Sequence, residues 1–424
     1  MILFGIVILL CALLGTPLFV IIGALALLFF HSVGIDTSAV VVEMYRMASS
    51  PTLLAIPLFT FTGFVLAKSN TSKRLINLSG ALFGWLPGGL AVVALVTCAF
   101  FTAFTGASGV TIIALGGLLY PMLVSEKYPK KFSLGLMTAS GSLGLLFPPS
   151  LPLILYGMVS QTSVDQLFLA GIIPGIILIL ILSGYSIRWG FAAQVKKTPL
   201  SFKEISKALK EMAWEIPLPM IILGGIYGGI FTATEAAAVT AVYVVVIECF
   251  IYREIRFARD VPRIMKESMV LVGGILIILG AALGLTSYLI DQQVPMKILA
   301  LMKTYISSKY TFLILLNILL LIVGCMMDIF SAIMVVVPLI TPIATSFGVD
   351  PIHLGIIFLT NLEIGYSTPP VGLNLFIASS RFKEPVVKLY GAALPFLGLR
   401  LIALILITYV PFISLWLVEL LQVR

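Results

Sequence analysis

Two double prolines, Pro148-Pro149 and Pro369-Pro370, lie inside long apolar stretches of this sequence. Proline lacks a backbone amide donor and collides with the preceding turn, so a helix breaks at such a pair. Within a bilayer, a broken helix is tolerated only where its freed backbone groups are buried in protein or line a watery cavity. Two such interruptions in the two halves of one chain therefore indicate a binding site of a transporter.

The composition indicates the environment of these breaks. The chain has 424 residues, of which 60% are hydrophobic and only 10% are charged. Its apolar runs approach the length that spans a membrane, and short charged loops separate them. The sequence lacks the alternating ten-residue strands that are typical of a membrane β-barrel. We therefore expect an all-α polytopic membrane protein that lies in the lipid bilayer.

The basic residues suggest a membrane topology and not a nucleic-acid partner. The formal net charge is +8, but the Lys and Arg residues cluster in loops between apolar segments, as the positive-inside rule predicts. No Lys or Arg precedes Arg46, so we expect residues 2–30 to form a retained first span, interrupted at residues 15–17. The four cysteines lie in apolar stretches and the two histidines match no metal-binding spacing, so no resident cofactor is predicted.

The charges of the loops predict on which side of the membrane each remaining loop lies. The basic residues 188–214 are expected to be cytoplasmic, whereas residues 161–165 and 346–352 are expected to face outward. Amphipathic surface helices are expected at 71–84 and 291–310, and interrupted hairpins at 87–123 and 311–345. Further spans are expected at 51–67, 132–160, 166–187, 216–231, 235–251, 268–290, 353–380 and 389–419.

Residues 87–123 carry a polar interruption at 104–109 and permit two interpretations. Two membrane passes fit the segment, and so does one re-entrant hairpin. The basic residues Lys73 and Lys127 flank it on its two sides, so both flanks look cytoplasmic and an even number of crossings is needed. Because each arm is short and the tip is rich in glycine and hydroxyl groups, we favour a hairpin whose tip stops inside the membrane.

The two halves of the sequence repeat one another. The double prolines are separated by 369 − 148 = 221 positions, and the same offset relates three further pairs of landmarks. Because the loop charges send the two broken spans in opposite directions, we expect inverted repeats, which give one sequence two packings of similar energy. The landmarks are Gly144 and Gly365, Pro121 and Pro342, and Gly63 and Gly284; the expected units are a first repeat at 1–187, the connector at 188–214 and a second repeat at 215–424.

Each broken span faces the tip of the hairpin that precedes it, which suggests two cation sites. Carbonyl and hydroxyl oxygens collect where helix ends converge, and they suit a hard monovalent cation. The bland alternative is that proline and glycine merely kink these helices. The first candidate site contains Thr102, Thr105, Gly144, Phe147 and Pro149, and the second contains Gly324, Gly365, Thr368 and Val371.

A third set of polar residues lies near the same interruptions and is a candidate for substrate binding. Ionisable groups at membrane depth are costly and usually functional, although Glu363 could instead pair with a neighbour. Glu235, by contrast, is expected to cap the helix that it opens, together with Thr232 or Thr234. The substrate candidates are Ser108, Asp328, Ser331, Asn361, Glu363 and Asn374.

Three motifs resemble the large membrane subunit of tripartite ATP-independent periplasmic (TRAP) transporters. They are Gly-Gly-Ile-Tyr-Gly-Gly-Ile-Phe-Thr-Ala-Thr-Glu-Ala-Ala-Ala-Val at 224–239, Phe-Pro-Pro-Ser-Leu-Pro-Leu-Ile-Leu-Tyr-Gly at 147–157, and Asn-Leu-Glu-Ile-Gly-Tyr-Ser-Thr-Pro-Pro-Val-Gly-Leu-Asn-Leu-Phe at 361–376. The resemblance covers the whole chain. It implies a sodium-driven importer of organic acids, such as a C4-dicarboxylate or the sugar acid sialic acid, in a prokaryotic cytoplasmic (inner) membrane.

The resemblance also implies partners and a mechanism. The family works with a small four-helix membrane subunit and a periplasmic substrate-binding protein, and it moves two hairpins against a fixed scaffold as an elevator. Its sodium sites correspond to the two hairpin-and-break regions described above. Two departures are visible: the first tip reads Thr105-Gly106-Ala107-Ser108 where Ser-Gly-Ser-Ser is usual, and Ala233 replaces a usual proline.

Other functions can be weighed against transport with a binding protein. An intramembrane enzyme would need a nucleophile with a base, or metal ligands, and the sequence offers no such pattern, so we do not expect an enzyme. A passive channel would conduct without coupling. A stand-alone sodium/anion symporter of similar architecture is the main alternative, because its sequence signals would be the same.

Overall fold

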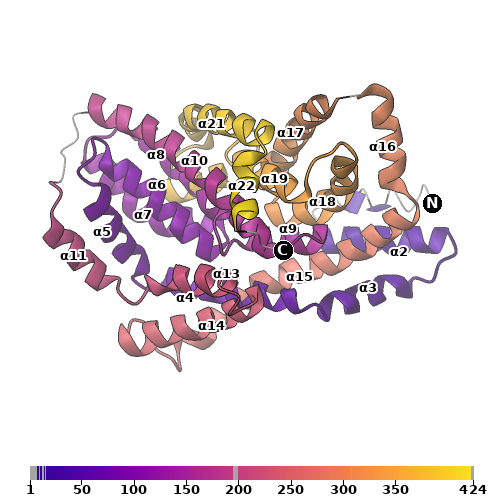
Figure 1. Ribbon diagram of the computed structural model, residues 1–424, viewed down its shortest axis with the longest axis horizontal. Helices are drawn as coiled ribbons and strands as arrows, with labels where there is room; N and C mark the ends of the chain where they lie inside the picture. Colours follow the sequence, from indigo (N-terminus) through magenta and orange to yellow (C-terminus); the bar gives the residue numbers. More distant parts are fainter. Residues whose placement is uncertain are drawn as a thin grey trace.

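The computed structural model describes residues 16–193, 199–306 and 308–421, together with residues 7, 8, 10, 11 and 14. Every regular element in these residues is helical (Figure 1). The elements of the first half are α2 (Leu18–Ser32), α3 (Ser38–Ala48), η1 (Pro51–Leu54), α4 (Ala55–Lys68), α5 (Thr71–Phe83), α6 (Gly89–Thr105), α7 (Ser108–Ser125), α8 (Lys130–Ser140), η2 (Leu143–Leu146), α9 (Leu151–Ser160) and α10 (Val164–Ala192).

The second half begins with α11 (Phe202–Glu211). Its N-cap is Ser201, whose hydroxyl accepts a hydrogen bond from the Glu204 amide in the first turn. Eight helices of the described residues are long and apolar enough to cross a membrane, or nine if the bent pair around the first break is one span. The remaining elements are α12 (Pro217–Pro219), η3 (Met220–Gly224), α13 (Gly225–Tyr227), α14 (Ala233–Val246), η4 (Ile247–Ile251), α15 (Asp260–Asp291), α16 (Val294–Tyr305), α17 (Lys309–Met326), α18 (Ile329–Ser346), α19 (Pro351–Gly365), α20 (Leu373–Phe382), α21 (Val386–Tyr409) and α22 (Phe412–Leu420).

The helices α5 to α10 recur as α16 to α21. The offset that separates the double prolines carries both ends of α7 onto both ends of α18, and it pairs α6 with α17, α8 with α19, and α9 with α20. The peptide bond between the two prolines is cis in both breaks. The structure therefore consists of two repeats, each with a helical hairpin and a proline-broken helix, and the expected fold class is confirmed.

A local two-fold axis relates the hairpins and broken helices of the two repeats. α7 packs against α20 and α18 packs against α9, so each hairpin contacts the broken helix of the other repeat in a reciprocal way. At the axis, Ser142 Oγ donates to the carbonyl oxygen of Glu363, 3.3 Å away and 221 positions later in the chain. A residue and its equivalent can touch only where they lie beside the symmetry axis. A two-fold axis of this kind is the one expected for two repeats within a single transporter chain.

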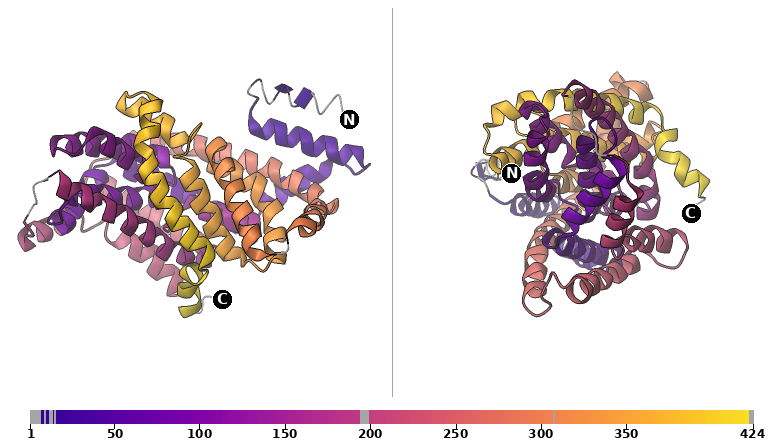
Figure 2. Two further views of the ribbon diagram at one scale, coloured as in Figure 1. Left: turned by 90° about the horizontal axis from the view of Figure 1, so that it is seen from above. Right: turned by 90° about the vertical axis from the view of Figure 1, so that its left-hand side faces the viewer.

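These helices form a central body, which we define as α6–α9 and α17–α20 with α10 and α21. The two hairpins lie on opposite sides of it in Figure 1, with α9 and α19 between them. Seen from above, α21 crosses the middle of the molecule between the hairpins (Figure 2). The described residues of α19 are almost completely buried, so this broken helix lies at the core of the body.

The remaining helices form a scaffold, which we define as α2–α5 and α11–α16. α15 packs lengthwise against α2 and α3, and α14 packs against α4. Glu235 and Thr232 form a reciprocal capping box at the start of α14, because the Thr232 side chain accepts from the Glu235 amide and the Glu235 carboxylate accepts from the Thr232 amide. The expected capping role of Glu235 is confirmed.

Two expected spans differ from the structure. Residues 216–231 were expected to cross, but the helical segment Pro217–Tyr227 is about 16 Å long at 1.5 Å per residue, roughly half of a bilayer core. Gly228 and Gly229 end it in a turn. Residues 389–419 were expected to be one span, but α21 ends at Tyr409 and α22 begins beyond Pro411, because proline cannot continue the helix. The expected interruption at 15–17 lies partly outside the described residues, and α2 begins after Pro17.

Candidate functional site

The tip of the first hairpin and the first break are in contact, as the sequence predicts. α6 ends at Thr105, and Gly106 follows with a φ of +63°, a left-handed conformation that suits glycine. A β-carbon added to Gly144 would lie 2.1 Å from the Ala99 carbonyl oxygen and 2.6 Å from Thr102 Cβ. The absence of a side chain at Gly144 is therefore what allows the broken helix to reach the backbone of α6.

Two threonine hydroxyls in the last turns of α6 are buried. Thr102 Oγ1 lies 2.7 Å from Thr111 Oγ1 and 2.9 Å from the carbonyl oxygen of Gly141. Thr105 Oγ1 is buried without a hydrogen-bond partner. Phe147 directs its ring toward Gly175 of α10 instead, and Pro149 follows it in the break. Of the five residues predicted for the first cation site, Thr102 and Gly144 thus share one contact, whereas Thr105 lines a narrow cavity between α4, α5 and α6.

The second hairpin tip and the second break repeat this arrangement. A β-carbon added to Gly365 would lie 2.6 Å from Gly324 Cα, so the two glycines face each other directly. Thr368 donates its hydroxyl to the Ile364 carbonyl at 2.9 Å, and its own carbonyl accepts from Cys325 Sγ at 3.3 Å. The residue after Val371, Gly372, donates its amide to the Cys325 carbonyl. Gly324, Gly365 and Thr368 therefore meet, and Val371 follows them at a more exposed position.

One pair of substrate candidates joins the two repeats. Ser108 Oγ donates a hydrogen bond of 2.8 Å to Asn374 Oδ1, and both side chains are buried. Asn374 Nδ2 has no hydrogen-bond partner. Ser108 opens α7 and Asn374 lies in the first turn of α20, so the N-terminal ends of these two helices converge. Helix N-terminal ends carry partial positive charge, which favours an anion.

The other substrate candidates have partners within the protein. Asp328 caps α18 by accepting from the amides of Phe330 and Ser331 and from the Ser331 hydroxyl. Asn361 donates to Asn317 Oδ1 at 2.7 Å and to a carbonyl of its own helix, and its Oδ1 is buried without a partner. These contacts explain how the polar side chains are held inside the protein.

A buried ion pair lies beside the two-fold axis. Arg400 of α21 contacts Glu363 Oε1 at 2.8 Å, and both side chains have 0% exposure. The same guanidinium donates to the Glu363 carbonyl at 2.8 Å and to the hydroxyls of Ser142 and Ser367 at 3.0 and 3.3 Å. Glu363 Oε2 and Arg400 Nε remain without partners. One arginine thus connects the helix ends that lead into both breaks.

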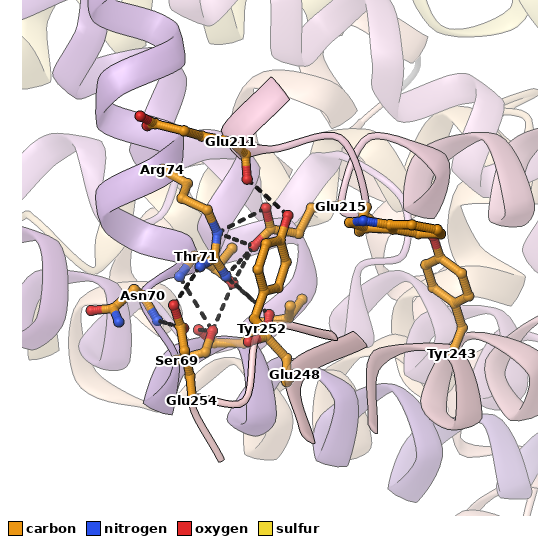
Figure 3. A network of polar contacts seen from close by, with 12 residues as sticks. Ser69, Asn70, Thr71, Arg74, Glu211, Glu215, Tyr243, Glu248, Tyr252 and Glu254 are labelled. Atoms are coloured by element: carbon orange, nitrogen blue, oxygen red, sulfur yellow. Dashed lines mark hydrogen bonds and ion pairs between the residues drawn. The ribbon is translucent and has the colours of Figure 1, made fainter. Parts of the chain in front are cut away.

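A second ion network lies in the scaffold (Figure 3). Arg74 of α5 contacts Glu215 at 2.6 Å, Glu254 at 2.6 Å and Glu248 at 3.2 Å. The Tyr252 ring lies 3.9 Å from the Arg74 guanidinium carbon, close enough for a cation–π contact. The network joins α5 to the turn before α12, to η4 and to the segment that follows η4, so it anchors α5 to the rest of the scaffold.

The charges of this network depend on their mutual contacts. Burial opposes the charged form of Arg74, but the hydrogen bond and charge of Glu215 outweigh it, and the net effect raises the Arg74 pKa. Burial also opposes ionisation of Glu254, yet hydrogen bonds from Asn70 and Arg74 lower its pKa below the ordinary 4.5. Both groups are therefore held in their ionised forms at neutral pH.

Sequence reasoning missed Arg400 and the partners of Arg74. An arginine inside the apolar run 389–419 is a signal of a functional or paired group at membrane depth, and it was available. Arg74 falls in the expected amphipathic surface helix at 71–84, where no buried ion network was expected, although only 8% of it is exposed. Its partners lie 141 to 180 positions away in the chain, and no local pattern links them.

Comparison with known proteins identifies the family. The family model described as the tripartite ATP-independent periplasmic transporter, DctM component, matches residues 4–413. The chain belongs to this family. It is therefore the large permease of a TRAP transporter, a multi-pass protein of the cytoplasmic membrane, and the expectation that it is not an enzyme is confirmed by its family.

Relatives of the permease share a third or more of its sequence. The C4-dicarboxylate TRAP transporter large permease protein DctM of Pseudomonas aeruginosa is 38% identical over 93% of this chain and 92% of its own. The corresponding protein of Rhodobacter capsulatus is 36% identical over 99% of both chains. The isethionate TRAP transporter permease protein DctMQ of Oleidesulfovibrio alaskensis is 36% identical over 95% of this chain and 64% of its own.

Solved structures of distant transporters share the fold. The YdaH transporter of Alcanivorax borkumensis has a TM-score of 0.65 at 14% identity, over 88% of the permease and 87% of that chain. MtrF of Neisseria gonorrhoeae has a TM-score of 0.52 at 15% identity, over 88% of the permease and 83% of that chain. At these identities, the similarity concerns the fold alone.

Proposed function

We propose that the permease imports a small organic acid together with Na⁺, by moving the central body against the scaffold as an elevator. The observation that supports this most directly is the twofold contact between hairpin tip and broken helix, at Gly144 with α6 and at Gly365 with Gly324. Each contact brings together the C-terminal ends of two helices. These ends carry partial negative charge and free carbonyl oxygens, which suit a monovalent cation.

The polar groups at the tips fit this proposal. The Thr102 hydroxyl lies 2.7 Å from the Thr111 hydroxyl and 2.9 Å from the Gly141 carbonyl oxygen, so three neutral oxygens are already close together at the first tip. The described residues hold no group of three or more His, Cys, Asp or Glu that could bind a metal ion. The donor set is thus neutral oxygen, which is weak enough to release a transported Na⁺ in each cycle. Na⁺ is here cargo and coupling ion, not a resident cofactor.

The substrate carboxylate is proposed to bind where the N-terminal ends of α7 and α20 converge. Ser108 and Asn374 lie at these ends, and Asn374 Nδ2 is a buried donor without a partner. The equivalent helix α18 in the other half begins with Asp328, whose carboxylate already occupies the cap. A bound anion would be repelled there, so the first hairpin tip is the better anion site.

The class of substrate is inferred from relatives. Their names specify C4-dicarboxylate, isethionate, and ectoine or 5-hydroxyectoine, and the C4-dicarboxylate permeases of the family are among the most similar. We infer a C4-dicarboxylate or similar carboxylate, delivered by a periplasmic binding protein. A small four-helix membrane subunit is the second proposed partner, and the part of DctMQ that this chain does not cover is long enough to supply one.

Reconstitution tests the proposal. The permease, its small subunit and its binding protein are placed in liposomes with labelled succinate outside, under an inward Na⁺ gradient or an equal K⁺ gradient. We expect accumulation only with Na⁺ and only with all three proteins. Accumulation with K⁺ alone would contradict sodium coupling. Uptake that persists without the binding protein would favour the stand-alone symporter.

A further inference from the structure

The scaffold breaks the symmetry of the central body. In the first repeat, α4 and α5 pack against α6, the first arm of the hairpin. In the second repeat, the equivalent helices α15 and α16 pack against α18, the second arm. The contacts between each hairpin and the broken helix of the other repeat are reciprocal, whereas these contacts with the scaffold are not. Two hairpins with equivalent structures therefore present opposite arms to the scaffold.

The exposed side chains show the same asymmetry. One face of α17 leaves six apolar side chains uncovered, whereas the equivalent positions of α6 are all buried. Ile322, for example, is 55% exposed, and its equivalent Phe101 is 2% exposed. The α17 face consists of Ile314, Leu315, Ile318, Leu319, Ile322 and Met326, and its equivalents in α6 are Val93, Ala94, Thr97, Cys98, Phe101 and Thr105.

The second arms show the converse. Ile113 and Met122 of α7 are exposed, whereas their equivalents on α18, Met334 and Ile343, are buried. The uncovered face of α17 and these two uncovered positions of α7 thus have buried counterparts on the other hairpin. Exposure to lipid alone does not explain this difference between the hairpins, because lipid would contact the equivalent faces of both hairpins equally.

A pair of equivalent scaffold glycines completes the pattern. A β-carbon on Gly63 of α4 would lie 2.2 Å from the Phe104 carbonyl oxygen at the first hairpin tip. The equivalent glycine of α15, Gly284, faces Val40 of α3 instead, and the three atoms nearest to its β-position all belong to Val40. Only the first tip is seated on its scaffold glycine. The residue of α17 equivalent to Phe104 is Cys325.

We infer that the apolar face of α17 is a docking surface for α15 and α16 of the same chain, and that the structure represents one of two end states. In the other state the second hairpin tip rests on Gly284, as the first tip rests here on Gly63, and α4 and α5 move from α6 to α7. This inference rests on the proposed elevator function, and it adds which faces exchange and in what register. Gly63 and Gly284 are then positioning residues for the two tips.

Two equivalent cysteine pairs test the inference. Leu66 and Phe101 line one narrow cavity between α4 and α6, so Leu66→Cys with Phe101→Cys reports the present state. The equivalent pair, Ser287→Cys with Ile322→Cys, reports the inferred state. Ser287→Cys with Ile314→Cys is the matched control, because Ile314 is equally exposed but eight residues, or about 12 Å, along α17. A short bis-maleimide is applied to the assembled transporter, and mass spectrometry identifies the linked peptides.

We expect both reporter pairs to cross-link in transport-competent protein, the control pair not to, and each link to exclude the other and to stop succinate uptake. Absence of the 287–322 link in a protein that transports would overturn the inference and leave the proposed function intact. Links from Ile322→Cys to the small subunit, or formation of both links in one molecule, would also overturn it. Cross-linking of both pairs in a protein that shows no sodium-driven uptake would support the docking surface and contradict the function.

A second pair of variants uses the glycines themselves. Gly63→Ala places a methyl group against the backbone of the first hairpin tip, and this backbone cannot move away without disturbing the tip. The substitution should therefore favour the inferred state and increase formation of the 287–322 link. Gly284→Ala meets only a Val40 side chain here, so it should leave the 66–101 link intact and lower the yield of the 287–322 link. Equal effects of the two substitutions on both links would contradict the inference.

Discussion

Ser108 and Asn374 are separated by 266 positions in the chain but share a hydrogen bond of 2.8 Å at the meeting point of two helix N-terminal ends. A carboxylate substrate at this point would receive the free Asn374 amide donor. Asn374→Asp replaces that donor with a negative charge. We expect the apparent affinity for succinate to fall by roughly 10- to 100-fold, as the loss of a hydrogen bond to a charged group implies.

Ser108→Ala should lower the apparent affinity for succinate less than Asn374→Asp does, because it removes one hydroxyl and adds no charge. The measurement is the concentration dependence of uptake at saturating Na⁺. If both variants alter the sodium requirement and leave the succinate requirement unchanged, the carboxylate does not bind at this pair.

Thr368→Val tests the second cation site. The substitution keeps the side-chain shape and removes one oxygen next to the second break. If the hydroxyl ligates Na⁺, half-maximal uptake should require about 5- to 30-fold more Na⁺, which corresponds to about 1–2 kcal/mol. The matched control is Thr360→Val in α19, the helix that leads into this break, because the Thr360 hydroxyl also donates to the carbonyl four residues earlier, that of Ile356.

If only the Thr368 carbonyl is used, Thr368→Val should be nearly silent and Thr368→Pro should be damaging. An unaltered sodium dependence in both Thr368 variants would show that the second break is a structural kink.

The Glu363–Arg400 pair predicts a non-additive stability change. Removing one partner leaves a buried charge uncompensated, so Glu363→Leu or Arg400→Met alone should each destabilise by about 3–5 kcal/mol. The double variant should be more stable than either single variant, since both charges are gone. Thermal unfolding of the purified permease measures the effect. Additive losses in the double variant would show that the two side chains act independently.

Glu254 predicts a pH dependence of the scaffold. Its folded-state pKa is lowered below the ordinary 4.5, so its contribution to stability is present above about pH 4.5 and is lost as the pH falls through the folded value. Glu254→Gln should lower the unfolding temperature at pH 7 and reduce its further drop on acidification. Glu204→Gln, at an exposed position of α11, is the control. If the unfolding temperature of Glu254→Gln fell as steeply at acidic pH as that of the unaltered protein, the role of this carboxylate would be contradicted.

Loop charge predicts the orientation of the chain. Ser346 lies in the segment expected outside, and Lys203 lies in the basic connector expected inside; both are exposed. An impermeant maleimide added to intact cells should label Ser346→Cys and should label Lys203→Cys only after permeabilisation. The reverse pattern would contradict the predicted orientation of the chain in the membrane.

The sequence predicted those parts of the fold that local chemistry determines. The double prolines located both breaks because proline acts on its own turn, and the constant offset predicted the correspondence of the two hairpins. The length of a helix was harder to predict where an apolar run continues through a turn, as it does from Tyr227 through Gly229. Apolar residues in a turn and in a helix have the same hydropathy, and glycine marks the difference only weakly.

The candidate site was predictable as a set of residues but not as a set of contacts. Ser108 and Asn374 were both recognised as polar groups near interruptions, yet their hydrogen bond depends on how the two repeats pack. Arg74 illustrates the same limit, since its three carboxylate partners come from segments far along the chain. Arg400 was also missed, but its signal was local, because a charged residue in an apolar run can be recognised without its partner.

The contact between Ser142 and Glu363 has a consequence for how such a chain can arise. Two identical halves paired as a homodimer would set the same side chain against itself at this point on the axis. Two carboxylates there would repel each other, and two serines would offer no carboxylate to an arginine. Joining the halves in one polypeptide lifts that restriction, because each copy can then change alone. The ion pair that ties both breaks to α21 is therefore a feature that duplication followed by divergence permits and strict symmetry forbids.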